Sequence, residues 1–246
     1  IDSCLADLAK SVVLLDKAEL EPSHFNYWAV RGLLSRIYAY KGDEQKAGRE
    51  ALDVINSGMF PLATSNKDPM FTAEHLFSLY SYTNYALAYY KSLFNTDNPV
   101  GLSTKAQTEL FISGSGASTD WRRAFVDPEN GIAFGNTTSP KKFYGTSNNI
   151  LPLIRVTELY YIAAESEVSA GHFDQATALL DSVRVHRNLK VYTTPALTGD
   201  SLSTEIFKEY QKEFLGEGQL FYYFKRRNLP FADLPITVVP VSAHAS

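Results

Sequence analysis

The chain has 246 residues, 45% of them hydrophobic, which is enough for a substantial core in one or two domains. The formal net charge is −4 and the basic residues form no run, which argues against nucleic acid as a partner. The single cysteine, Cys4, excludes an internal disulfide and a zinc cluster, and no stretch approaches the roughly 20 apolar residues that span a membrane.

The N-terminal part predicts an amphipathic helix followed by a helical hairpin. Apolar residues recur every three or four positions over Leu5–Leu20, before Pro22. Trp28–Gly58 then carries two apolar helical stripes that are separated by Gly42, and its tryptophan is expected in the core. Glycine tolerates the left-handed conformation that ends a helix, and the small Ala47 lets the two helices approach closely.

Residues 63–152 differ from this pattern and predict a long insertion rich in loops, with one or two short strands. Aromatic side chains crowd Glu74–Phe94, for which we expect an irregular-to-helical structure, with two short strands as the alternative. Glycine, proline and asparagine are frequent from Asn95 onward. Loops of this kind lie at the surface and commonly supply binding residues, while helices supply rigidity.

A second helical hairpin is predicted over Arg155–Leu189. Gly171 separates its two apolar stripes and is followed five residues later by Ala176, the spacing that also joins Gly42 to Ala47. Asn188 closes the unit and is a residue type that readily adopts the left-handed conformation. The two hairpins favour a tetratricopeptide-like repeat, whose units bury their apolar faces against neighbours of the same kind.

A last helix is predicted over Ser203–Phe224, followed by a short strand-like run at Ile236–Val241. One face of this helix carries acidic residues at four-residue spacing, where like charges repel unless cations intervene. We expect the cations to come from a neighbouring element, and Arg155, Arg184 and Arg187 are the candidates. The acidic residues are Glu205, Glu209, Glu213 and Glu217.

No catalytic or metal-binding constellation is found in the sequence. The five histidines lack metal-ligand spacing, and GxSxG and HExxH motifs are absent. The run Gly114-Ser115-Gly116 predicts an ordinary flexible loop. Four carboxylates, Glu158, Glu165, Glu213 and Glu217, are expected to form salt bridges to Arg155, Arg184 or Arg226. The alternative, a paired-acid glycosidase, needs two carboxyls across a cleft with one pKa raised.

Sugar capture has different requirements, because a pyranose ring offers an apolar face and a rim of hydroxyls. The loop segment Ser118–Arg123 supplies an exposed flat aromatic and planar hydrogen-bonding groups, with Asp120, Trp121 and Arg122 as candidates. The competing interpretation places Trp121 in the core and makes Asp120 the cap of a short helix. A second candidate group contains Tyr80, Tyr82, Asn84 and Tyr85, for which core packing is the alternative.

Several of these segments together resemble the SusD/RagB family of surface glycan-binding lipoproteins from Bacteroidetes. The resemblance covers the upstream helix, both hairpins and the last helix, and corresponds to the C-terminal half to two thirds of a member. Tyr210, Leu220 and Tyr223 depart from it, since the family commonly has arginine, arginine and aspartate there, which predicts a weakened polar network. The residues that carry the resemblance are Arg155–Glu165, Asp181–Arg184, Asn188, Leu189, Glu209, Glu213, Glu217, Gly218, Phe221 and Arg226.

The resemblance implies a mainly all-α, SusD-like single domain over 1–246, with parts at 1–62, 63–152 and 153–246. It implies a non-catalytic protein without cofactors that is held at the outer-membrane surface by a lipid anchor in the full-length protein. Such a protein binds oligosaccharides and passes them to a TonB-dependent SusC-like transporter. The alternatives are a tetratricopeptide-type adaptor that binds protein alone, or a helical glycoside hydrolase.

Overall fold

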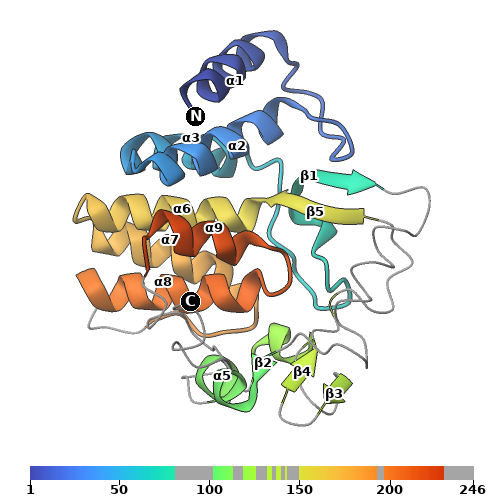
Figure 1. Ribbon diagram of the computed structural model, residues 1–246, viewed down its shortest axis with the longest axis vertical. Coiled ribbons are helices and arrows are strands. Elements are labelled where there is room, and N and C mark those ends of the chain that lie inside the picture. Colours follow the sequence, from blue (N-terminus) through green and yellow to red (C-terminus); the bar gives the residue numbers. More distant parts are fainter. Residues whose placement is uncertain are drawn as a thin grey trace, which may run out of the picture.

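The computed structural model describes residues 1–80, 102–112, 119–125, 132–134, 137–139, 142, 150–192 and 197–229. Its helices stack in layers from α1, through the pair α2 and α3 and the pair α6 and α7, to α8, with the described insertion segments at the end of the stack (Figure 1). The helices of the stack are α1 (Asp2–Leu14), α2 (Tyr27–Lys41), α3 (Glu44–Ser57), α6 (Val156–Ser169), α7 (Phe173–Val185), α8 (Gly199–Glu213) and α9 (Gln219–Arg226). The mainly helical architecture predicted from the sequence is confirmed.

Both predicted hairpins are present, and their turns have the predicted backbone conformation. Gly42 ends α2 with φ of 82°, and Gly171 follows α6 with φ of 79°. Asn188 is also left-handed, with φ of 59°. Ala47 and Ala176 are fully buried at the starts of the second helices, as their small size predicts.

The two hairpins meet where α3 packs against α6, at a glycine that the sequence analysis did not single out. A Cβ atom added to Gly48 would lie 2.2 Å from Ser166 Oγ and 2.4 Å from Ser166 Cβ. Because contacts this short do not occur between real atoms, the two helices can approach this closely only with hydrogen at that position. Around this crossing one large core joins residues of α2, α3, α6, α7, α8 and α9.

The first helix ends earlier than predicted. The expected helix over Leu5–Leu20 stops at Leu14, and Leu15 is already extended. The chain then turns where the Asp16 carboxylate accepts the backbone N–H of Ala18 at 2.9 Å. This local bond competes with the helix and brings the Lys17 carbonyl to the Nε1 of Trp28, which donates to it at 2.9 Å. Trp28 itself is 8% exposed, as expected for a core residue.

The favoured prediction for Glu74–Phe94 is wrong over its described start. A short 3-10 helix, η1 (Thr72–Glu74), leads into the strand β1 (His75–Tyr80), and 81–94 lies outside the described residues. β1 pairs antiparallel with β5 (Ile150–Arg155), with His75 opposite Arg155 and Tyr80 opposite Ile150. This strand pair brings the two ends of the insertion together beside the hairpins (Figure 1).

The remaining described parts of the insertion contain more regular structure than predicted. An antiparallel sheet has the order β2-β4-β3, which exceeds the one or two strands expected. Its strands are β2 (Leu102–Ser103), β3 (Ile132–Phe134) and β4 (Thr137–Ser139). Short helical segments accompany it, namely α5 (Thr104–Gln107), the π-helix η2 (Thr108–Ile112) and the 3-10 helix η4 (Trp121–Phe125).

The single helix predicted over Ser203–Phe224 is two helices. α8 ends at Glu213, and α9 begins after Gly218, which has φ of 79°. The intervening Gly216 is also left-handed, with φ of 77°, so the chain cannot continue helically through this segment. The break lets α9 turn away from the line of α8 and pack against α2 and α6. The strand-like run predicted at Ile236–Val241 lies outside the described residues.

The close approach at Gly48 predicts an unusual response to alanine. In an ordinary helix interior, Gly→Ala adds about 1 kcal/mol of stability. For Gly48→Ala we expect a net loss of about 1–3 kcal/mol in the free energy of unfolding, because the new methyl group overpacks against Ser166. Urea unfolding measures the change. The double variant Gly48→Ala with Ser166→Gly is the control and should recover part of the loss, whereas a Gly48→Ala protein more stable than wild type would contradict the crossing.

Candidate functional site

The segment that contains the predicted sugar-binding residues is fastened to the end of the second hairpin. The Trp121 backbone N–H donates to the Arg187 carbonyl at 3.1 Å. Thr119 and Asn188 exchange two further bonds, Thr119 Oγ1 to the Asn188 carbonyl and Asn188 Nδ2 to the Thr119 carbonyl, each 2.9 Å long. Trp121, whose side chain is half-buried, is the first residue of the short helix η4. These bonds therefore hold the start of η4 rigidly against the end of the second hairpin.

Asp120 and Arg122, the polar partners predicted for a sugar, lie inside the protein. They are 3% and 2% exposed. Asp120 Oδ1 accepts both the backbone N–H and Nε of Arg122, at 3.0 and 2.9 Å, and so caps η4. The alternative interpretation of Asp120 as the cap of a short helix is confirmed, while Trp121 remains partly exposed beside it.

Arg122 also connects this segment to the last long helix. Its Nη2 lies 2.6 Å from Glu209 Oε2, and its Nη1 lies 3.1 Å from Glu213 Oε2, both on α8. Arg122 thus supplies positive charge to the acidic face of this helix. The sequence predicts those cations from the second hairpin and a sugar contact for Arg122, because nothing local to residue 122 indicates a partner on α8.

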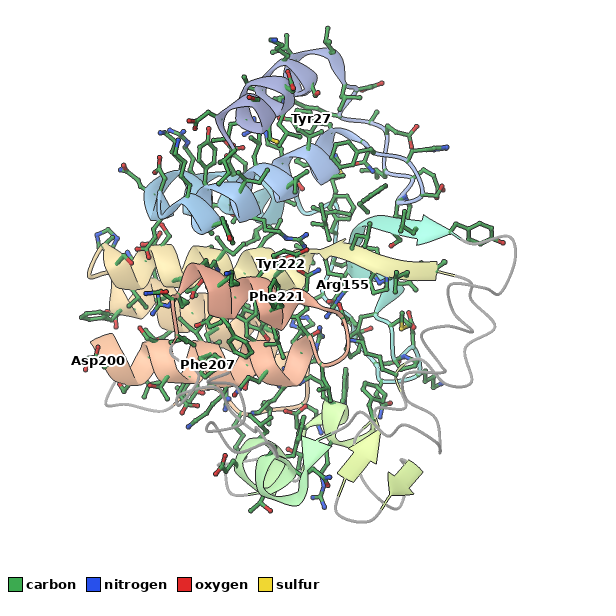
Figure 2. The ribbon with its side chains drawn as sticks, viewed as in Figure 1. Tyr27, Arg155, Asp200, Phe207, Phe221 and Tyr222 are labelled. Atoms are coloured by element: carbon green, nitrogen blue, oxygen red, sulfur yellow. The ribbon has the colours of Figure 1, made fainter. Side chains whose placement is uncertain are left out.

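Two arginines of the second hairpin complete the cluster, as predicted. Arg155 Nη1 lies 2.7 Å from Glu213 Oε1, and Arg187 Nη2 lies 2.9 Å from the same oxygen. Both arginines also bind Glu74 from the insertion, at 3.1 and 2.8 Å. Arg155 lies where β5 meets α6 (Figure 2). A single carboxylate, Glu213, is thus bound by three guanidinium groups.

Further pairs extend the cluster at both ends. Lys142 Nζ binds Glu217 and donates to the Glu213 carbonyl at 3.0 Å. Arg184 Nη1 lies 3.3 Å from Glu209 Oε1, as the sequence analysis predicted for this arginine. We call the ten buried residues the buried charge network, and they comprise five basic and five acidic side chains: Arg122, Lys142, Arg155, Arg184, Arg187, Glu74, Asp120, Glu209, Glu213 and Glu217.

Two other predicted carboxylates form ion pairs outside this network. Glu165 binds Arg226, as expected. Glu158 does not bind the predicted arginines but Arg36, whose Nε donates to Glu158 Oε1 at 2.7 Å. Arg36 comes from α2, so this pair joins the first hairpin to the second. The prediction missed it because helical spacing identifies the face that a residue occupies but not which neighbour covers that face.

Tyr210 and Tyr223 stand where the family commonly has arginine and aspartate, and in this structure they make aromatic contacts. Both rings are buried, at 2% and 4% exposure, with centroids 4.6 Å apart. Tyr161 and Phe214 join them, with centroids 5.1 and 5.2 Å from Tyr210. The Arg226 guanidinium lies over the Tyr223 ring at 4.7 Å. The α8–α9 corner is therefore held by ring contacts.

The network keeps its carboxylates ionised despite their burial. Burial alone would raise the pKa of Glu213, but the charges of Arg187 and Arg155 outweigh this and hold that pKa well below its usual range. The same balance lowers the pKa of Glu217, where Arg155 and Lys142 face the carboxylate. Since the pKa of each carboxylate is lower in the folded than in the unfolded state, both stabilise the fold at neutral pH.

The lowered pKa values predict a stability that falls in acid. The contribution of Glu213 is complete above its unfolded pKa, about 4.3, and is lost as the pH falls through the lower folded value. We expect Glu213→Gln to lower the free energy of unfolding by about 3–5 kcal/mol at pH 7, because it leaves buried arginines uncompensated. The free energy of unfolding of this variant should then fall less between pH 6 and pH 3 than that of wild type.

Urea unfolding at both pH values tests this prediction. Glu44→Gln serves as the control, since Glu44 lies at the surface, 4.0 Å from Arg227. That variant should stay within about 0.5 kcal/mol of wild type. Equal acid sensitivity of the Glu213→Gln variant and wild type would show that this carboxylate does not supply the acid response.

The second candidate sugar-binding group is described only at its first member. Tyr80 ends β1 and is 51% exposed, whereas Tyr82, Asn84 and Tyr85 lie outside the described residues. Among the residues that the structure describes, His, Cys, Asp and Glu form no group of three suited to a metal ion. In the same part of the chain, every helix is too short or too polar to cross a bilayer.

The comparisons with known proteins agree with this architecture. No curated protein matches the chain. A SusD superfamily protein from Bacteroides thetaiotaomicron is similar in structure, with a TM-score of 0.73 and 27% identity over 92% of this chain and 55% of its own. Two Bacteroides vulgatus structures share the fold. One is a SusD superfamily protein with a TM-score of 0.74 and 21% identity, over 91% of this chain and 53% of its own. The other is a SusD-like carbohydrate binding protein with a TM-score of 0.72 and 20% identity, over 91% of this chain and 50% of its own.

The chain thus spans about half the length of these solved structures. The sequence model of the SusD family matches residues 26–231, which begin just before α2 and extend just past α9. This range contains both hairpins, the insertion between them and the whole buried charge network. The chain belongs to the SusD family.

Proposed function

We propose that this chain binds oligosaccharide at the cell surface, through a site that includes Trp121, and passes it to a TonB-dependent SusC-like transporter. Membership of the SusD family supports the carbohydrate-binding role. One structural relative is a SusD-like carbohydrate binding protein. The lipid anchor at the outer membrane and the transporter partner belong to the same proposal and follow from the family.

The main support for this site is the rigid position of Trp121. Its ring is half-buried, and its backbone is fixed to the end of α7 by the bond to Arg187. A flat ring held in this way can stack on the apolar face of a pyranose with little loss of conformational entropy. Asp120 and Arg122 contribute by holding η4 in place through their ion pairs.

The role we propose is binding without catalysis. A paired-acid glycosidase needs one carboxyl whose pKa is raised. Burial acts in that direction on Glu209, Glu213 and Glu217, but the neighbouring basic side chains outweigh it and lower all three pKa values. These carboxylates hold the fold together and are poorly suited to donate a proton at neutral pH.

The Trp121→Ala variant tests the proposed site. In affinity gels that contain neutral plant and bacterial polysaccharides, we expect the retardation seen with wild type to be reduced, by an affinity loss of about three- to tenfold. Phe221→Ala is the matched control, because Phe221 is also an exposed aromatic, at 61% exposure, and lies on α9. Equal retardation of the Trp121→Ala protein and wild type would contradict the site, and no retardation of wild type by any glycan would contradict the function.

A further inference from the structure

The polar partners that the sequence predicts for a sugar beside Trp121 are not accessible to a ligand. Asp120 and Arg122 are buried, and their polar atoms are used in ion pairs and in the cap of η4. A sugar ring that stacks on an aromatic side chain still presents hydroxyl groups around its rim, and these need hydrogen-bonding partners on the protein. Such a partner has to be polar, exposed and close to Trp121 in the fold.

Asn188, at the end of the second hairpin, meets these requirements. Its side chain is exposed, although the preceding Arg187 is buried. The Trp121 backbone N–H donates to the Arg187 carbonyl, so the two segments lie side by side. Thr119 and Asn188 are joined by hydrogen bonds in both directions. The Asn188 amide therefore lies against the chain only two residues before Trp121.

The geometry of this contact defines the orientation of the Asn188 amide. The amide atom 2.9 Å from the Thr119 carbonyl must be the nitrogen, because a carbonyl oxygen accepts hydrogen bonds and cannot donate one. The bond occupies one of the two N–H groups of Nδ2. Within the described part of the chain, neither the other N–H nor Oδ1 has a hydrogen-bond partner. One donor and one acceptor are thus left for a ligand.

The backbone of Asn188 makes this amide unusually well fixed. Its φ of 59° is left-handed, a conformation that asparagine adopts more readily than most residues with a side chain. Asn188 therefore makes the turn at the end of α7 and also presents a polar group there. Because the turn and the bond to Thr119 already hold the amide, a ligand that binds it costs little side-chain entropy.

We propose that Asn188 contacts the ligand and determines specificity in the proposed oligosaccharide site. Oδ1 accepts a hydrogen bond from one ring hydroxyl, and the remaining N–H of Nδ2 donates to the adjacent hydroxyl of a sugar that stacks on Trp121. The inference rests on the proposed function, because it assigns a second contact to the same site. The amide is neutral and both donates and accepts, so it selects a neutral sugar with two adjacent hydroxyls.

The Asn188→Gly variant tests this contact, because glycine keeps the left-handed backbone and removes only the amide. In isothermal titration with maltoheptaose, xylohexaose, mannohexaose and cellohexaose, we expect about three- to tenfold weaker binding of any oligosaccharide that wild type binds. The melting temperature should stay within about 4 °C of wild type, since the lost bond to Thr119 is offset by the easier left-handed turn.

Asn228→Gly is the matched control. Asn228 is also an exposed asparagine with a left-handed backbone, at φ of 48°, but it follows α9 and has no part in the Trp121 segment. This variant should bind within about twofold of wild type. A loss of affinity equal to that of Asn188→Gly would show that the turn, and not the Asn188 amide, determines binding.

Nuclear magnetic resonance of wild type gives a readout that needs no variant. The side-chain amide signals of Asn188 and the indole N–H signal of Trp121 should both shift as the oligosaccharide is added. Unchanged Asn188 signals during binding would reject the inference, and so would an Asn188→Gly protein that binds as tightly as wild type. If Trp121→Ala loses affinity in either case, the proposed function stands. If wild type binds none of the four oligosaccharides, both are rejected for these sugars.

Discussion

A carboxylate bound by three guanidinium groups is the interaction on which the described structure depends. Glu213 lies where Arg122 of the insertion and Arg155 and Arg187 of the second hairpin converge, and none of these side chains is more than 2% exposed. Charges in such surroundings are tolerated only when their partners are present. The network therefore requires the insertion, the hairpin and α8 to be assembled together, and this requirement fixes how the loop-rich part is held against the helices.

This dependence changes the interpretation of the segment that contains Trp121. The residues on either side of it have the chemistry of a sugar site, yet the structure uses their polar atoms to connect η4 to α8. Residue type indicates what a side chain can bind, but burial decides what it does bind. Trp121 remains on a support that cannot shift without breaking ion pairs, and the proposed stacking of a sugar on its ring relies on this rigidity.

Much of the helical frame could be predicted from the sequence, because helical spacing and turn glycines are local signals. The hairpins around Gly42 and Gly171 follow from them, and so does the need for cations along the acidic face of α8. The missed features depend on distant partners. β1 is a strand because β5 pairs with it from the other end of the insertion, and Gly48 matters only because Ser166 faces it. The true role of Arg122 likewise depends on carboxylates about 90 residues later in the chain.

The sequence separation of the paired charges also has a consequence for the order of folding. Each hairpin closes over a short turn, so its helices can form from local contacts on a fast timescale. Arg187 and Glu74, by contrast, are 113 residues apart, and Arg155 and Glu213 are 58 apart. Closing such long loops is entropically costly, and the partners gain little until several meet at once. We therefore expect the insertion to dock last, as one cooperative and comparatively slow step onto helices that are already formed.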